Sequence, residues 1–399
     1  MTQLYEAAET LPDDTRPPSG PLFAIGIAAF VATMAAMALI PHDPYVRWQS
    51  VRTEAYARLG WSFERIHDDP TPVDVALIGT SHTMNGIDGS VVAGELAQLG
   101  FREPSGRCAT VTNFAIPSYG RNLHYLLVRE LLSARKPRAI VLEVLENETR
   151  KAHPLFSHVA TADDMVEAPR IGNLNYFSDL ARLPYRQVVL GVESLAPAQF
   201  GLKTRFDPTN YDGSEVDNTH VVNVGGKALT SSLDTAMDPG ALGQAAETLN
   251  KNKRLNYLPK AFEDYEYAMP RRYVQELLQL ADRHGVPVLL LYLPGFGKPA
   301  RPVDMSLYGV GRPLITVNDI LAKRPYWHDV HHLNAQGAQQ VSRRLAQLLY
   351  AALKNNNSLG QKAKLPSTGE TGCNFGIPAR IVSARPAQSR VIDSAFAAD

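Results

Sequence analysis

Residues 73–82 read VDVALIGTSH and hold the features that decide the fold and the reactive site of this chain. The apolar run from Val75 to Ile78 has the length of a buried strand, and it stops at Gly79. A strand that ends at a glycine turn presents the next side chains at the carboxyl edge of a sheet, where open α/β folds collect reactive groups. Ser81 is therefore a candidate nucleophile, although a helix cap or an ordinary turn serine also fits this position.

Strand and helix patterns alternate outward from this segment. Strands are predicted near residues 73–78, 109–114, 139–145 and 286–293, and helices near 91–99, 123–134, 273–284 and after 334. The alternation predicts an α/β fold: a three-layer sandwich whose central parallel sheet is covered by helices on both faces. The pattern lapses over residues 151–260, which we interpret as an insertion. Such insertions more often carry substrate selection than core structure.

Composition divides the chain into further segments. We predict a polar leader over residues 1–20, a transmembrane helix over residues 21–41 and a membrane-proximal stalk over residues 42–71. The folded domain is predicted over residues 72–352 and a tail without fixed structure over residues 353–399. The stalk carries aromatic residues typical of membrane interfaces, namely Tyr45, Trp48 and Trp61. The tail turns to Asn, Ser, Gly, Pro and Ala, which cannot bury enough apolar surface to fold.

The transmembrane prediction depends on the segment from Leu22 to Ile40, which contains no charge. At about 1.5 Å per residue it would reach roughly 28 Å, close to the thickness of the hydrocarbon core of a bilayer. A cleaved signal peptide fits less well because the leader is acidic, and a buried core helix is the plainer alternative. Arginines are more frequent after this segment than before it, which by itself favours a cytoplasmic domain.

Overall composition narrows the possible partners. The chain has 40 basic and 40 acidic side chains, so we expect no nucleic-acid partner. No cofactor motif is visible, and we expect no cofactor. Its two cysteines, Cys108 and Cys373, could form a disulfide or remain as thiols.

The second reactive stretch, residues 327–337, reads WHDVHHLNAQG. Asp329 and His332 stand three residues apart, just before a helix that Asn334 can cap. One short loop can therefore supply both an imidazole and the carboxylate that orients it. With Ser81 this makes a triad, in which His332 takes the proton from the serine and Asp329 stabilises the imidazolium.

Residues of these stretches also allow two other chemistries. The histidines of this stretch could bind zinc together with Asp329, but they precede the predicted helix and no second ligand group is apparent, so we expect no metal site. Glu143 and Glu146 could form the paired carboxylates of a glycosidase. On one strand, however, they would alternate between faces or be separated by the strand end.

Together these blocks resemble the SGNH (GDSL-like) hydrolase superfamily. The resemblance is carried by GTSH at residues 79–82, by Asn147 after the third strand and by DVHHLNAQG at residues 329–337. The blocks are most similar to its membrane-anchored envelope branch, which includes proteins similar to DltD and the polysaccharide O-acetylation proteins. The resemblance covers residues 73–147 and 286–349 and leaves the insertion unexplained.

The resemblance implies a flavodoxin-like sheet and an acyl-Ser81 intermediate, with Asp329 and His332 completing the catalytic triad. Contributions to the oxyanion hole are then expected from Ser81, Ser118, Gly120 and Asn147. Contacts with substrate are expected from His82, Asn113 and His331. The sequence departs from the family pattern at three places: GTS replaces GDS, Ser118 stands where the second block has glycine, and Leu145 replaces the glycine of the third block.

The expected function is a membrane-anchored serine acyl-transfer enzyme, either an O-acetyltransferase or an O-acetyl esterase, acting on an envelope or exported glycan. Its expected partners are a glycan or lipid-linked acceptor, a membrane-bound acyl-donor partner and the membrane itself. Proteins of this branch hold the catalytic domain outside the cytoplasmic membrane, so we expect a single-pass inner-membrane protein with a periplasmic domain, against the arginine bias. The alternative is a non-catalytic envelope scaffold of the same fold, which binds a glycan or an export partner while Ser81 stays idle.

Overall fold

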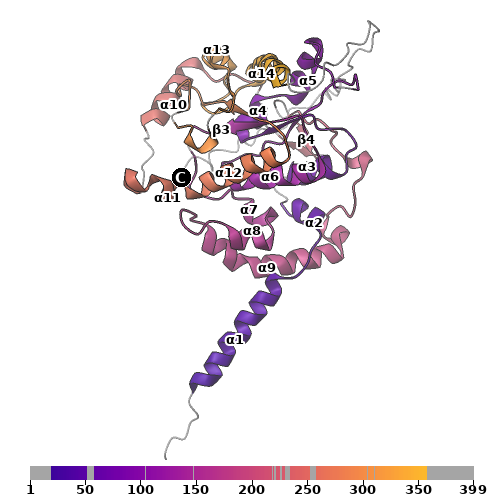
Figure 1. Cartoon of the computed structure of the whole chain (residues 1–399), viewed down its shortest axis with the longest axis vertical. Helices are drawn as coiled ribbons and strands as arrows, with labels where there is room; N and C mark the ends of the chain where they lie inside the picture. The colour runs from indigo at the N-terminus through magenta and orange to yellow at the C-terminus, as the bar shows by residue number, and fades with distance from the viewer. Residues whose placement is uncertain are drawn as a thin grey trace, which may run out of the picture.

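A parallel sheet of five strands lies at the centre of the chain (Figure 1). The computed structural model describes residues 19–51, 58–103, 105–146, 148–217, 219, 222–224, 227–229, 234–251, 258–302, 304–309 and 311–356. The strands are β1 (Val75–Ile78), β2 (Val111–Asn113), β3 (Ala139–Val144), β6 (Val288–Tyr292) and β7 (Leu314–Thr316). Their order is β2-β1-β3-β6-β7 and every neighbouring pair is parallel. The predicted α/β class is confirmed, and β7 is a short strand that the sequence pattern did not indicate.

Helices cover both faces of the sheet, as the alternation predicts. One face is covered by α5 (Gly89–Gln98) and α14 (Ala335–Asn356), and the other by α3 (Arg58–His67), α6 (Arg121–Ala134) and α12 (Ala268–Arg283). The remaining α-helices are α1 (Ser19–Ala38), α2 (Pro44–Gln49), α4 (Ser81–Gly86), α7 (Phe156–Val159), α8 (Ala162–Glu167), α9 (Tyr176–Leu195), α10 (Pro239–Lys251), α11 (Glu263–Glu266) and α13 (Asn318–Leu321). Short 3-10 turns cover Pro197–Phe200, Pro208–Asn210, Lys260–Phe262, Ser306–Tyr308 and Arg324–Tyr326, and β4 (Val222–Val224) pairs with β5 (Lys227–Leu229).

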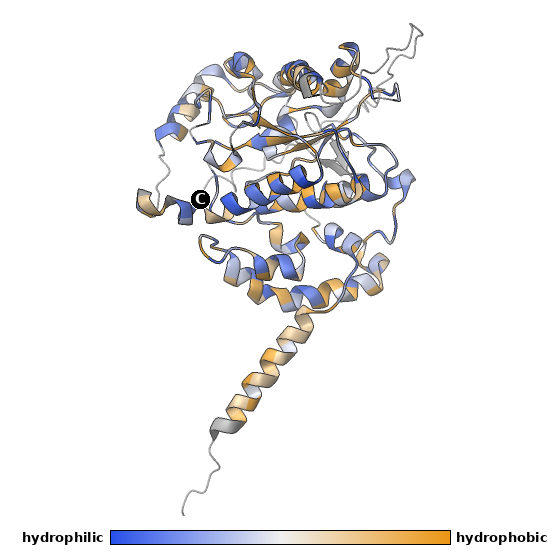
Figure 2. Cartoon of the chain, in the orientation of Figure 1, coloured by the Kyte–Doolittle hydropathy of each residue, from blue (hydrophilic) through white to orange (hydrophobic). Residues whose placement is uncertain are grey.

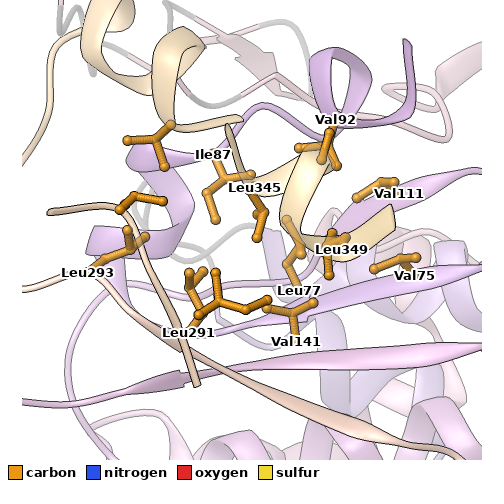
Figure 3. Packing of buried hydrophobic residues seen from close by; sticks show 14 of the residues in the cluster. Val75, Leu77, Ile87, Val92, Val111, Val141, Leu291, Leu293, Leu345 and Leu349 are labelled. Carbon is orange, nitrogen blue, oxygen red and sulfur yellow. The ribbon is translucent and has the colours of Figure 1, made fainter. Parts of the chain in front are cut away.

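The strands are buried on both faces because their side chains alternate between two hydrophobic layers. Val75 and Leu77 of β1 pack toward α5 and α14, whereas Ala76 and Ile78 pack toward α6 and α12. Figure 3 shows the first layer, where Leu345 and Leu349 of α14 lie over the sheet. This two-sided burial explains why the strands read as continuous apolar runs.

The prediction of a stalk over residues 42–71 is wrong, because α2 and α3 are packed into the domain. Trp48 and Trp61, expected at a membrane interface, are only 1% and 4% exposed, and Tyr45 is also buried. The buried guanidinium of Arg65 donates to the carbonyls of Thr71 and Pro72, which ties α3 to the start of β1. The folded domain therefore begins before the predicted boundary at residue 72.

The first part of the predicted insertion forms an additional helical layer. Helices α7, α8 and α9 pack with α2 on the side of α6 and α12 that faces away from the sheet (Figure 1). Phe156, Met165, Tyr176 and Leu183 contribute its buried side chains. This part of the insertion builds core structure, contrary to the expectation that the insertion serves substrate selection.

Helix α1 extends away from this layer into open space (Figure 1). It is coloured largely as hydrophobic in Figure 2, and its large apolar side chains are exposed, among them Leu22, Phe23 and Phe30. Over the described ranges, no helix is both long and apolar enough to cross a membrane. The transmembrane helix expected over residues 21–41 is thus not supported by this finding.

Two predicted end segments lie mostly outside the described residues. Residues 1–18 of the leader and residues 357–399 of the tail belong to this part, and so does Cys373. Cys108 is disulfide-bonded.

Candidate active site

Ser81 lies where the sequence predicts, at the carboxyl end of β1. The strand ends at Ile78, Gly79 turns the chain, and α4 begins at Ser81. Thr80 caps this helix, since its hydroxyl oxygen accepts the backbone N–H of His82 at 3.3 Å. The order of the sheet reverses between β1 and β3, and in open parallel sheets this is where binding crevices form.

The carboxylate of Glu143, at the end of β3, explains the glycine at position 79. Its oxygens accept the backbone N–H of Thr80 at 2.7 Å, the Thr80 hydroxyl at 2.9 Å and the Thr83 hydroxyl at 2.6 Å. A Cβ atom on Gly79 would lie 2.3 Å from this carboxylate and 2.4 Å from the Thr83 oxygen. Glu143 therefore holds the turn that carries Ser81, and the glycosidase interpretation of Glu143 loses its support.

Asp329 and His332 are presented by a tight turn between two anchored ends. Trp327 and Leu333 form an antiparallel bridge across it, and the buried Trp327 indole donates to the carbonyl of Leu321 at 2.9 Å. Asn334 then caps α14 as predicted, because its side-chain oxygen accepts the N–H of Gly337 at 2.9 Å. The turn therefore holds Asp329 and His332 in a fixed arrangement relative to each other.

Three side chains predicted as a triad are connected by hydrogen bonds. His332 Nε2 lies 2.9 Å from Ser81 Oγ, and His332 Nδ1 lies 2.9 and 3.1 Å from the two carboxylate oxygens of Asp329. An ionised carboxylate can only accept, so Nδ1 carries the ring hydrogen of the neutral histidine. Nε2 is then the acceptor that faces the Ser81 hydroxyl, which is the arrangement needed for a general base.

The carboxylate of Asp329 is kept ionised by its surroundings. Burial opposes ionisation, but the hydrogen bond and charge of His332 and the backbone N–H groups of His331 and His332 hold the pKa of this carboxyl well below its usual range. Both N–H groups donate at 2.7 Å. Asp329 is therefore a permanent acceptor that fixes both the orientation and the tautomer of His332.

The loop expected to supply oxyanion contacts is held in one conformation by His153. This buried ring accepts the N–H of Leu155 at Nδ1, so Nε2 carries the hydrogen that it donates to the carbonyl of Pro117 at 2.8 Å. Ser118 has a φ of 78°, which is rare for a residue with a side chain. A Cβ on Gly120 would lie 2.5 Å from the backbone nitrogen of His153, so only glycine fits there.

The predicted substrate-contacting histidines lie beside the triad. The His82 ring is 5.8 Å from both the His331 and the His332 rings, and the Tyr119 ring lies 6.3 Å from His82. His82 Nδ1 donates to the carbonyl of Leu293 at 2.9 Å, so Nε2 of the neutral ring is an acceptor. Burial, together with the positive charges that His82 and His332 carry when protonated, lowers the pKa of His331 to about 4, so this ring is neutral at pH 7.

Of two further predicted residues, Asn113 differs from expectation and Asn147 is not tested. Asn113 is buried, and its amide donates to the carbonyls of Thr83 and Ile87 at 3.1 and 2.9 Å while its oxygen accepts the N–H of Ala115. The predicted contact of Asn113 with substrate is therefore not supported: the side chain holds the end of α4 in place. Asn147, expected to contribute to the oxyanion hole, lies outside the described residues.

A buried ion pair behind the turn was not indicated by the sequence. The guanidinium of Arg121 pairs with Glu148 at 2.8 Å and donates to the backbone carbonyl of Glu143 at 3.0 Å. The hydroxyl of Tyr308 donates to the same Glu148 carboxylate at 2.5 Å. These residues come from distant parts of the chain, so no local pattern could have revealed them.

The histidine cluster and the second glutamate have other partners. His328 Nδ1 lies 3.1 Å from the carbonyl of Thr235, and Glu146 accepts the N–H of Gly295. Among the described residues, no group of three or more His, Cys, Asp or Glu side chains could hold a metal ion.

Comparison with known proteins does not identify a family for this chain. No protein-family model matches the chain, and no curated protein matches it.

Proposed function

We propose that this protein is a serine acyl-transfer enzyme that forms an acyl-Ser81 intermediate. The observation that carries the proposal is the continuous hydrogen-bonded chain from Asp329 through His332 to Ser81, at 2.9 Å for each closest contact. A serine hydroxyl is a weak nucleophile until an adjacent base takes its proton. Here the base is oriented by a carboxylate on the same turn, and the buried Glu143 holds the turn that carries the nucleophile.

The proposed reaction has two steps, acylation of Ser81 and then its deacylation. Ser81 Oγ attacks the acyl carbonyl carbon while its proton moves to His332 Nε2, and the tetrahedral intermediate collapses as His332 returns this proton to the leaving alkoxide. Water or a sugar hydroxyl then gives its proton to His332 and attacks the acyl-Ser81 carbonyl. Collapse releases the acid or the new ester and restores the serine hydroxyl.

Two donors are proposed for the oxyanion: the backbone N–H of Ser81 at the start of α4 and an N–H of the loop from Ser118 to Gly120. Removing one such donor costs about 3 kcal/mol of transition-state stabilisation in comparable sites. The anchoring of this loop by His153 supports the assignment, because a preorganised donor needs no rearrangement during reaction. The role of Asn147 in the oxyanion hole stays a prediction.

The substrate proposal follows the sequence resemblance to SGNH hydrolases. The parallel sheet order and the placement of the triad at its carboxyl edge support membership of that superfamily and a flavodoxin-like arrangement. We propose O-acetyl transfer to, or removal from, an envelope or exported glycan, with a lipid-linked acceptor and a membrane-bound acyl-donor partner as further expectations. The exposed apolar side chains of α1 support attachment to a membrane. A single-pass inner-membrane location with a periplasmic domain stays a prediction.

The test of the chemistry is acetyl release from p-nitrophenyl acetate, together with labelling by a fluorophosphonate probe. The full chain is compared with Ser81→Ala, His332→Ala and the matched control His328→Ala on the same turn. We expect Ser81→Ala to lose labelling, both triad variants to fall to background turnover and the control to keep wild-type activity. Equal inactivity of all four proteins toward both reagents would support the non-catalytic scaffold instead.

A further inference from the structure

Helix α9 presents an apolar stripe that nothing in the described structure covers. Its exposed residues include Phe177, Tyr185 and Leu195, which are 77%, 72% and 87% exposed. Ala181 and Val192 are also exposed, and the spacings of four, seven and three along this set place the five side chains on one side of the helix. The opposite side is buried against α2, α7 and α8.

The charges of α9 are segregated in the same way. Its two acidic residues, Asp179 and Glu193, are buried. Arg182 is exposed, and Arg186 is partly buried and donates to the carbonyls of His158 and Ala160. In the segment that leads into the helix, Arg170 is exposed three residues after the exposed Glu167, and Ile171 and Leu174 are 63% and 67% exposed. An apolar stripe flanked by cations and free of exposed carboxylates on its helix is typical of helices that lie on anionic lipid surfaces.

The end of α1 is fastened to α9, which couples the two apolar surfaces. The side-chain amide of Gln187 donates to the carbonyl of Ala38 at 3.1 Å, and the hydroxyl of Ser194 accepts the N–H of Asp43 at 2.9 Å. A Cβ on Gly191 would lie 2.6 Å from a side-chain methyl of Ile40, so the segment after α1 packs closely against α9 at this glycine. Figure 1 shows α1 leaving the domain from the side on which α9 lies.

We propose that the exposed stripe of α9 rests in the headgroup region of an anionic phospholipid bilayer and fixes the orientation of the domain on the membrane. The inference rests on the proposed attachment by α1, and it adds a second, lateral contact. A bilayer surface accommodates both the projecting α1 and the stripe beside its base, whereas a second protein would have to fit around α1. The aromatic rings of Phe177 and Tyr185 suit the boundary between headgroups and acyl chains.

Tryptophan fluorescence gives a direct test in the full chain. All three native tryptophans are buried, so they form a constant background. The test variant is Tyr185→Trp, and the control is Leu99→Trp, which follows α5 at the end of the molecule opposite α9 (Figure 1). Each variant is reconstituted into vesicles of phosphatidylcholine and phosphatidylglycerol with brominated acyl chains. We expect about twofold quenching of the new tryptophan at 185 and none at 99, because the apolar face of an interfacial helix lies about 5–10 Å into the headgroup and acyl boundary, near the brominated chains.

The outcomes separate this inference from the proposals on which it rests. Vesicle-bound protein without quenching at position 185 would overturn the α9 contact and leave attachment by α1 intact. An unquenched but blue-shifted signal in a dimeric protein would assign the stripe to a second copy and also overturn it. Absence of vesicle binding would remove both membrane proposals, whereas the acyl-transfer proposal is decided separately by p-nitrophenyl acetate turnover.

Discussion

Replacing Gly79 by alanine tests whether the turn that carries Ser81 depends on the buried glutamate behind it. The new methyl group would lie 2.3 Å from Glu143 Oε2 and 2.4 Å from Thr83 Oγ1, well inside van der Waals contact. Neither neighbour is a flexible surface side chain, because Glu143 is 1% exposed and Thr83 is also 1% exposed. One of the two must therefore move.

The cost follows from what this movement breaks. Glu143 accepts three hydrogen bonds, from the N–H and hydroxyl of Thr80 and the hydroxyl of Thr83. Hydrogen bonds to a charged group contribute about 1.5–3 kcal/mol each, and inserting a methyl group into a packed site costs about 1–3 kcal/mol. Losing one bond and retaining part of the strain gives a loss of about 3 kcal/mol in the free energy of unfolding. Turnover should fall about 100-fold, because a displacement near 1 Å of a reacting group has this effect.

Urea unfolding and p-nitrophenyl acetate turnover measure the two effects. Gly243→Ala is the matched control, since its new Cβ has no atom within 4 Å and α10 gains a better helix former. We expect the control to be unchanged or about 0.5–1 kcal/mol more stable, with normal turnover. If Gly79→Ala behaves like Gly243→Ala in both assays, the proposed role of the Glu143 carboxylate in holding the turn is wrong.

Three further predictions concern residues that support the site. Glu143→Ala leaves the buried Thr80 N–H without its acceptor and should cost about 3 kcal/mol in urea unfolding, against about 1 kcal/mol or less for the partly exposed Glu146→Ala; equal losses would contradict the assigned difference. Asn113→Ala should lower kcat with little change in KM, because this amide fixes α4; a selective rise in KM would restore the substrate contact first expected for it. Burial lowers the pKa of His153 from 6.5 to about 4, so as the pH falls the unfolded chain takes up this proton before the folded chain does. The free energy of unfolding therefore decreases below pH 6.5, by about 3 kcal/mol at pH 4. Between pH 6.5 and pH 4 the free energy of unfolding of His153→Gln should decrease by about 3 kcal/mol less than that of the wild type. If the pH profile of the urea midpoint is the same in both proteins, the lowered pKa of His153 is wrong.

The sequence alone determined the parts of the protein that obey local rules. Apolar runs and helical periodicity predicted the α/β class and four of the five strands of the main sheet, because strand burial on two faces leaves a continuous apolar segment. Gly79 before Ser81, and Asp329 three residues before His332, were legible for the same reason. Each pair lies on one turn, whose geometry is set by a few neighbouring residues.

Tertiary structure alone decided which distant groups meet. The contact of His332 with Ser81 joins residues 251 apart in the chain, and Glu143 reaches the turn of Ser81 from another strand. Trp48 and Trp61 show the limit of composition, because an aromatic, partly polar segment suits a membrane interface and a packed core equally well. Only packing against α6 and the additional helical layer buries them, and the same packing leaves the stripe of α9 uncovered. Burial depends on the whole set of neighbours around a side chain, and that set is fixed only when the elements assemble.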